Sequence, residues 1–138
     1  MTGLPFEITA IGFVRSALRD CSAAPRQGSE GAPDAKLEIL PEFLEGLTGI
    51  EPGQDIWILT WLHESQRSVL QVHPRGDPQN PLAGVFATRS PDRPNPIGLH
   101  RCRILDIAGN CVEVAALEAI DGTPIVDLKP VIESSRDF

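Results

Sequence analysis

Residues 97–119 read IGLHRCRILDIAGNCVEVAALEA, and this stretch decides the fold class. Apolar and polar side chains alternate through much of residues 97–107, which is typical of a half-buried β-strand. Gly109-Asn110 is a turn of hairpin type, and residues 111–119 return with strand-like composition. The stretch therefore predicts two antiparallel strands joined by a tight turn.

Short strand-like segments lie on both sides of this hairpin, and we expect strands over residues 6–15, 36–40, 55–63, 68–73, 84–88 and 125–128. The run DIWILTWLH at 55–63 is almost continuously apolar, which predicts a strand buried on both faces. PEFLEGL at 41–47 starts with proline and has glutamate in its first turn, so one short helix is expected there. Many short strands and one helix predict a mainly β protein, a barrel or a sandwich. No G-x-G-x-x-G follows a strand, so a Rossmann domain is excluded.

Length and composition indicate one globular domain over residues 1–138, since 41% of residues are apolar and 22% are charged. The sequence contains neither a run of about 18 apolar residues nor a secretory signal, and we expect a cytoplasmic protein. Cys21, Cys102 and Cys111 form no C-x-x-C pair, and the three histidines are scattered. We therefore expect idle thiols and no metal site.

The net charge of −7 argues against unselective coating of nucleic acid, but the basic residues are unevenly placed. Arginine supplies ten of the twelve basic residues, and residues 89–103 hold four arginines against Asp92 alone. Arginine suits sites where a planar fork grips a phosphate or a carboxylate.

The most unusual segment is GVFATRSPDRPNPIG at residues 84–98. Three prolines within six residues fix the backbone dihedral φ and remove N–H donors, so the loop has lost most of its chain entropy before any ligand arrives. Its polar residues then make a preorganised binding surface. The alternative is a rigid connection within the barrel that carries solvated arginines.

Three further segments are candidates, each with a plainer structural interpretation. PRQG at 25–28 offers a fork donor and an amide to an anion or an adenine edge, or it is an ordinary surface turn. His63-Glu64 closes the apolar strand where functional side chains emerge, although a histidine there is more often structural. LEAIDGTP at 117–124 carries two carboxylates, and Asp121 either caps its own turn or acts as an acceptor or base.

The same segments carry a family resemblance. IGFVRS (11–16), PRQG, DIWILTWLHE (55–64), GVFATRSPDRPNPIG and LEAIDGTPIVDLKP (117–130) resemble the TsaA/TrmO family, also called YaeB-like. The resemblance covers nearly the whole chain in the same order. It implies a single-sheet β-barrel with one or two short helices that binds S-adenosylmethionine as a homodimer. It further implies N6-methylation of the threonylcarbamoyl-modified adenosine at position 37 of tRNA.

Carried over motif by motif, the resemblance implies eleven cofactor contacts: Pro25, Arg26, Gln27, His63, Glu64, Arg89, Leu99, Ala115, Ala116, Leu117 and Glu118. Arg26 or Arg89 would clamp the cofactor's carboxylate. Because the acceptor N6 is amide-like and a poor nucleophile, we expect Asp121 or Glu118 to act as base or proton relay. Arg93, Arg101 and Arg103 are the residues expected to receive phosphates of the tRNA anticodon loop.

Three departures from the family pattern bear on function. This chain has His63-Glu64 where a His-Gln pair is frequent in the family. After the first strand it has the sequence RSALRD where RSPY-like sequences are common. The C-terminal domain of many bacterial members is not expected here. Two alternatives therefore stay open: a methyltransferase acting on another substrate, and an S-adenosylmethionine-binding sensor or interaction module without catalysis. A plain structural barrel would bind no such ligand.

Overall fold

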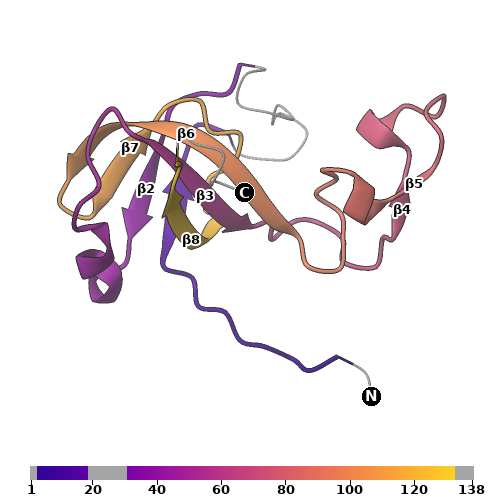
Figure 1. The fold of residues 1–138 in the computed structure, drawn as a ribbon, viewed down its shortest axis with the longest axis horizontal. Helices are drawn as coiled ribbons and strands as arrows, with labels where there is room; N and C mark the ends of the chain where they lie inside the picture. Colours follow the sequence, from indigo (N-terminus) through magenta and orange to yellow (C-terminus); the bar gives the residue numbers. More distant parts are fainter. Residues whose placement is uncertain (1–2, 19–30, 133–138) are drawn as a thin grey trace.

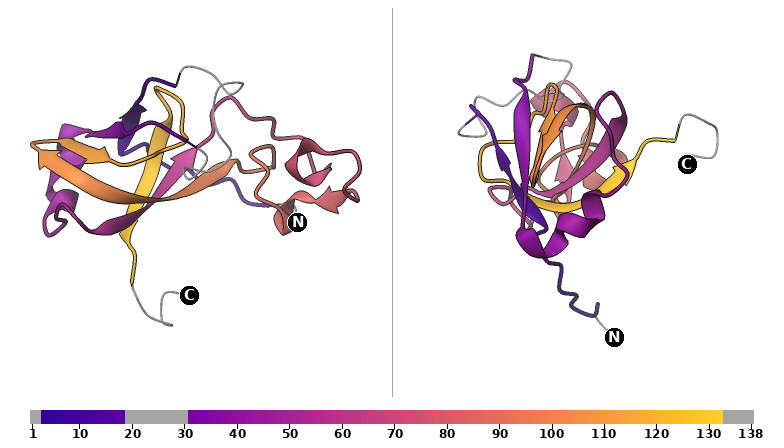
Figure 2. Two further views of the ribbon diagram at one scale, coloured as in Figure 1. Left: turned by 90° about the horizontal axis from the view of Figure 1, so that it is seen from above. Right: turned by 90° about the vertical axis from the view of Figure 1, so that its left-hand side faces the viewer.

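A computed structural model describes residues 3–18 and 31–132, and six of its strands close into a barrel. The barrel strands are β1 (Gly12–Arg15), β2 (Ala35–Ile39), β3 (Asp55–Trp61), β6 (Ile97–Ala108), β7 (Cys111–Val114) and β8 (Pro124–Pro130). Their order around the barrel is β1-β2-β7-β6-β3-β8, every neighbouring pair is antiparallel, and β8 closes on β1 (Figure 1). The right-hand view of Figure 2 shows the strands around a common centre.

The alternating side chains of each strand make the core. In β2 and β6, inward residues are buried and outward ones exposed, and Leu37, Ile104 and Ile125 are among the fully buried side chains. β6 is twelve residues long because its first half pairs with β3 and its second half with β7, with a register shift between Ile104 and Asp106. Gly109, in a left-handed conformation at φ 62°, starts the two-residue turn into β7.

Different elements cover the two ends of the barrel. At one end lies the 3-10 helix η2 (Pro41–Leu47), from which Phe43 and Leu47 pack against the core. At the other end the chain from β7 to β8 crosses the opening, and its Leu117 and Ala119 are buried in the core. A single closed sheet and these two end segments therefore enclose the core.

Residues 62–96 leave the barrel between β3 and β6 and form a lobe at its side (Figures 1 and 2). The lobe holds the short ribbon of β4 (Gln71–Val72) and β5 (Ala83–Gly84), and two one-turn 3-10 helices, η3 (Pro74–Gly76) and η4 (Val85–Ala87). It contains the proline-rich segment that the sequence singled out.

The mainly β barrel fold is confirmed, and several boundaries are corrected. The strand at residues 55–63 is not buried on both faces: β3 alternates, because its outward Trp57 and Trp61 lie beneath arginine side chains instead of a second layer. The strand expected at 6–15 starts at Gly12, and the one expected at 111–119 ends at Val114. Residues 68–73 and 84–88 contribute only the two-residue strands β4 and β5. Within the described residues, no helix combines the length and apolar character that crossing a membrane requires.

Candidate functional site at the mouth of the barrel

The antiparallel pairing brings most of the candidate segments to one end of the barrel. β1, β3 and β7 finish at this end, where β2, β6 and β8 begin. We call this end the mouth and define it by residues 16–18, 33–34, 62–64, 96–97 and 115–123. It therefore gathers the DGTP turn, the His63-Glu64 pair and the exit of the proline-rich segment.

The loop after β7 is fixed against both neighbouring elements. The Ala115 amide donates to Arg103 of β6 at 3.0 Å, and the Leu117 amide donates to the Pro33 carbonyl at 3.0 Å. Between them, the Ala116 amide donates to the Asp34 carboxylate at 3.1 Å, and Ala116 itself has φ 52°. A left-handed alanine is a strained conformation that only surrounding contacts maintain. This bend ends β7 and directs the following residues along β6.

Glu118, carried by this loop, joins a hydrogen-bonded line that reaches into the barrel. His100 Nδ1 lies 2.5 Å from Glu118 Oε1, and His100 Nε2 lies 2.8 Å from Thr60 Oγ1. Thr60 is fully buried, the His100 side chain is 6% exposed and that of Glu118 is 16% exposed. The line therefore runs from the closed interior to an acid that solvent reaches at the mouth.

Neither Thr60 nor His100 was among the candidates predicted from sequence. Inward positions of β6 are Gly98, His100, Cys102 and Ile104, so the one strongly polar side chain at an inward position was a usable signal. A histidine at a buried strand position requires a partner. Its partners come from β3 and from the loop after β7, which the order of residues along the chain does not reveal.

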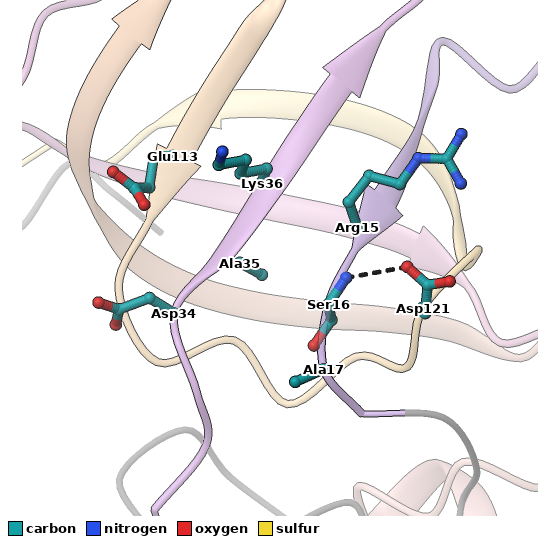
Figure 3. Close-up of a pocket in the computed structure, with 8 residues that line it drawn as sticks. All are labelled: Arg15, Ser16, Ala17, Asp34, Ala35, Lys36, Glu113 and Asp121. Atoms are coloured by element: carbon teal, nitrogen blue, oxygen red, sulfur yellow. Dashed lines mark hydrogen bonds between the residues drawn. The ribbon is translucent and has the colours of Figure 1, made fainter.

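Asp121 lies at the rim of the mouth and supports the turn into β8. Its Oδ1 accepts from the Ser16 amide at 2.9 Å, and its own amide donates to the Leu18 carbonyl at 2.7 Å. Figure 3 shows this contact among the residues that line an open hollow. The volume of the hollow is about 500 Å³. The hollow is lined by Arg15, Ser16, Ala17, Asp34, Ala35, Lys36, Glu113 and Asp121. Asp121 therefore joins the turn before β8 to the residues after β1, and its side chain also lines the hollow.

His63 and Glu64 follow the end of β3, where the Leu62 amide donates to the Pro96 carbonyl at 2.8 Å. His63 Nε2 and Glu64 Oε2 are 3.8 Å apart, and the two side chains are 36% and 47% exposed. Their side chains are accessible at the mouth, as contact with a ligand requires.

The proline-rich segment is held together by its own arginine. Arg93 donates through Nη2 to the carbonyls of Val85 and Thr88, both at 2.6 Å, and through Nε to Ser90 at 2.7 Å. These bonds give Arg93 a structural role inside the loop, and its contact with RNA stays a prediction. Arg89, in contrast, is exposed on the same loop.

Two further contacts join this loop to the residues after β3. Asp92 accepts from the Gln66 amide at 2.9 Å, and Arg67 donates to the Pro94 carbonyl at 2.6 Å while its guanidinium lies 5.1 Å from the Trp61 ring centroid. The segments at 62–67 and 85–96 therefore form one connected unit beside the mouth.

Leu99, Arg101 and Arg103 point outward from β6, on the opposite face of the strand from His100. Arg101 and Arg103 both contact Asp55, at 2.9 and 3.4 Å, and Leu99 is 43% exposed. The hydrogen bond from Arg101 is the main reason that the pKa of Asp55 is lowered. The structure thus separates these three predicted contacts, on the outer wall, from Glu118 and Asp121 at the mouth.

Pro25, Arg26 and Gln27 lie outside the described residues. Leu18 and Pro33, the described residues near that segment, both contact the loop at 115–121. Of the predicted positions that are described, the mouth holds His63, Glu64, Ala115, Ala116, Leu117, Glu118 and Asp121. Its carboxylates suit a cationic ligand with hydroxyl and amino groups, and exposed Arg89 suits a carboxylate.

Comparison with known proteins shows the family. The chain belongs to the tRNA-methyltransferase O N-terminal domain family, whose model matches residues 13–136. A "Probable S-adenosyl-L-methionine-binding protein" of Methanothermobacter thermautotrophicus is 40% identical over 133 residues, which cover 96% of this chain and 95% of that protein. An "S-adenosyl-L-methionine-binding protein" of Archaeoglobus fulgidus is 40% identical over 119 residues, covering 86% and 84%.

Solved structures agree with this membership. A crystal structure of TrmO from Pseudomonas aeruginosa superposes with a TM-score of 0.75 at 30% identity, covering 94% of this chain and 57% of that chain. The chain thus spans less than two thirds of the TrmO chain that it matches.

Proposed function

We propose that this protein binds S-adenosylmethionine at the mouth of the barrel and transfers its methyl group to N6 of the threonylcarbamoyl-modified adenosine at position 37 of tRNA. Family membership and the relatives' names support the cofactor. The observation that carries the proposal is the convergence of Glu118, Asp121 and the His63-Glu64 pair at one barrel end. These segments are far apart in the sequence, and they meet only because the sheet closes.

The residues of the mouth would bind and orient the reactants. S-adenosylmethionine supplies an electrophilic methyl group, whose bond to sulfur breaks as the bond to nitrogen forms, with the electron pair remaining on sulfur. Glu118 or Asp121 would accept the proton that N6 loses, and Arg89 would hold the cofactor's carboxylate. Orientation of two reactants contributes up to roughly 7–11 kcal/mol, so we assign most of the rate gain to positioning.

The methyl acceptor would be presented by the anticodon loop of tRNA. A base in such a loop is already unpaired, so no duplex has to open. Arg101 and Arg103 would bind phosphates only by sharing their guanidinium groups with Asp55, or by releasing it. We expect the active form to be a cytoplasmic homodimer.

A second candidate function is cofactor binding without tRNA methylation. It is favoured by the net charge of −7 and by the contacts of Arg101 and Arg103 with an acid of their own chain. Both features weaken attraction to a polyanion. A methyltransferase that acts on a different substrate would also bind S-adenosylmethionine.

Titration calorimetry with S-adenosylmethionine and with S-adenosylhomocysteine tests the first half of the proposal. We expect saturable binding, and a loss of at least about tenfold in affinity for Arg89→Ala, because a charge-assisted hydrogen bond is removed. Arg75→Ala, in an exposed arginine of the same lobe, is the matched control. No binding of either ligand would refute the proposal, and equal affinity of the two variants would remove Arg89 from the site.

The acceptor is tested with tRNA that carries or lacks the threonylcarbamoyl group on adenosine-37. Transfer only to the modified tRNA supports the proposal. Binding without transfer to any cellular RNA supports the second candidate function. Mass spectrometry of tRNA nucleosides from a deletion strain, before and after the protein is restored, gives the same answer in cells.

A further inference from the structure

We propose that His100 and Thr60 form a built-in support for Glu118, and that His100 is a positioning residue for the chemistry at the mouth. The effect of His100 on methyl transfer rests on the proposed function. That His100 holds Glu118 rests only on the hydrogen bonds that join Thr60, His100 and Glu118.

The surroundings of the line give no structural reason for polar groups there. The buried cluster that fills the barrel is apolar and includes Ile58 and Ile125, whose backbones neighbour His100 and Thr60 in the sheet. Burying a hydroxyl and an imidazole costs free energy unless both are hydrogen-bonded, and apolar residues of similar size avoid that cost. The polar pair is therefore best explained by what it does to Glu118.

Gly98 provides the space in which the pair meets. A Cβ atom at this position would lie 2.4 Å from Thr60 Oγ1 and 2.8 Å from His100 Nε2. Thr60 and Gly98 are direct partners across β3 and β6. Glycine at 98 thus allows the threonine hydroxyl to reach the imidazole.

The contacts determine which imidazole nitrogen carries the proton. A carboxylate only accepts hydrogen bonds, so Nδ1–H of neutral His100 donates to Glu118 Oε1. Nε2 then accepts from the Thr60 hydroxyl. Thr60 consequently satisfies the inner nitrogen of His100, and Nδ1–H holds Oε1 of Glu118. We expect Oε2 of Glu118 to contact the ligand.

The neighbours of the ring are one acid and one thiol. Glu118 contacts the ring directly, and Cys102 is the next inward residue of β6. Burial, followed by the charge of Glu118, raises the pKa of the Cys102 thiol to about 12, so this neighbour stays neutral. Glu118 is therefore the charged group that the imidazole orients.

The first test uses wild-type protein without cofactor. Proton–nitrogen NMR of the histidine rings should show His100 with its proton on Nδ1, the less common tautomer of free histidine, and His73→Asn assigns signals by removing an exposed histidine. Thr60→Ser, which keeps the hydroxyl, should preserve this tautomer, and Glu118→Ala, which removes the acceptor of Nδ1–H, should shift the population toward Nε2–H. A wild-type His100 with its proton on Nε2 would overturn the proposal.

The second test separates positioning from a merely structural role. His100→Asn places an amide near the position of Nδ1 and cannot take up a proton. We expect cofactor affinity close to that of wild type and a kcat lower by about a hundredfold. A merely structural role would instead lower cofactor affinity and kcat together. His73→Asn should match wild type in both measurements. An unchanged kcat in His100→Asn would refute the positioning role, even if its thermal stability were lower.

The two levels of the proposal fail in different ways. If wild-type protein neither binds S-adenosylmethionine nor transfers a methyl group, the proposed function is wrong, and the NMR result still decides whether the line holds Glu118. If wild-type protein is active and His100→Asn has the same kcat, only the inference about His100 is wrong.

Discussion

The substitution Gly98→Ala tests the packing on which the buried line depends. The added methyl group would lie 2.4 Å from Thr60 Oγ1, 2.8 Å from His100 Nε2 and 3.1 Å from Leu62 Cδ2. Contacts shorter than 3.0 Å are not sustained, so something has to move. Thr60 and His100 are buried and hydrogen-bonded to each other, so neither moves without breaking that bond.

The expected loss of stability follows from two costs. Overpacking a core by one methyl group costs typically 1–3 kcal/mol, so we assign it about 1–3 kcal/mol here. Leaving a buried donor or acceptor unpaired adds about 1–3 kcal/mol. We expect the free energy of unfolding to fall by about 2–6 kcal/mol. For a chain of this length the melting temperature would drop by roughly 7–20 °C.

Urea unfolding followed by circular dichroism measures this loss. Gly46→Ala is the matched control, because no atom lies within 4 Å of the added Cβ, and it should be neutral or stabilising by up to about 1 kcal/mol. Adding Thr60→Ala to Gly98→Ala removes the closest clashing atom, so the double variant should be more stable than the sum of the single effects predicts. Additive effects, or a Gly98→Ala protein as stable as Gly46→Ala, would refute the reasoning.

Three other predictions concern the lobe, the outer wall and the core. Arg93→Lys keeps the charge but loses the planar guanidinium group that donates to three carbonyls of the lobe. Limited proteolysis should therefore cut the lobe faster than in wild type. Equal rates of cleavage would contradict the structural role of Arg93. Arg101 lowers the pKa of Asp55 in the folded protein relative to the unfolded chain. The ionised carboxylate therefore adds to the free energy of unfolding at pH values above the unfolded-state pKa of Asp55. This contribution is lost as the pH falls through the lower pKa of the folded state. Asp55→Asn should remove that part of the pH dependence in urea unfolding, less than about 1 kcal/mol for an exposed pair. Burial raises the pKa of the Cys102 thiol to about 12. Of the two cysteines among the described residues, iodoacetamide at pH 8 should therefore label Cys111 in the native protein and Cys102 only after denaturation, as read by mass spectrometry.

Alternation and turn chemistry were sufficient to predict most of the barrel. The hairpin of β6 and β7 was predicted because residues 97–107 alternate and Gly109-Asn110 supplies the two-residue turn. The same rules overextended the strands at 68–73 and 84–88. These segments lie in the lobe, where side-chain hydrogen bonds from Arg67 and Arg93 replace most of the strand pairing.

The site was only partly accessible from sequence. Glu118 and Asp121 were candidates from the carboxylates of residues 117–124 and from the resemblance. The plainer interpretation had Asp121 capping its own turn, whereas its carboxylate accepts from the Ser16 amide on another segment. His100 was missed because its significance depends on register. It neighbours Thr60 only when β3 and β6 pair with Thr60 opposite Gly98.

The early end of β7 explains why an acid reaches the buried histidine. β7 pairs with β6 only as far as Val114 opposite Ile104, whereas β6 continues toward the mouth for seven more residues. A longer β7 would cover that part of β6 and place residue 118 on whichever face the alternation of a strand dictates. The left-handed Ala116, held by Asp34, ends the strand pairing instead, and the loop that follows brings Glu118 onto the inward side at His100. One strained residue in the wall of the barrel therefore determines that the acid lies at the mouth.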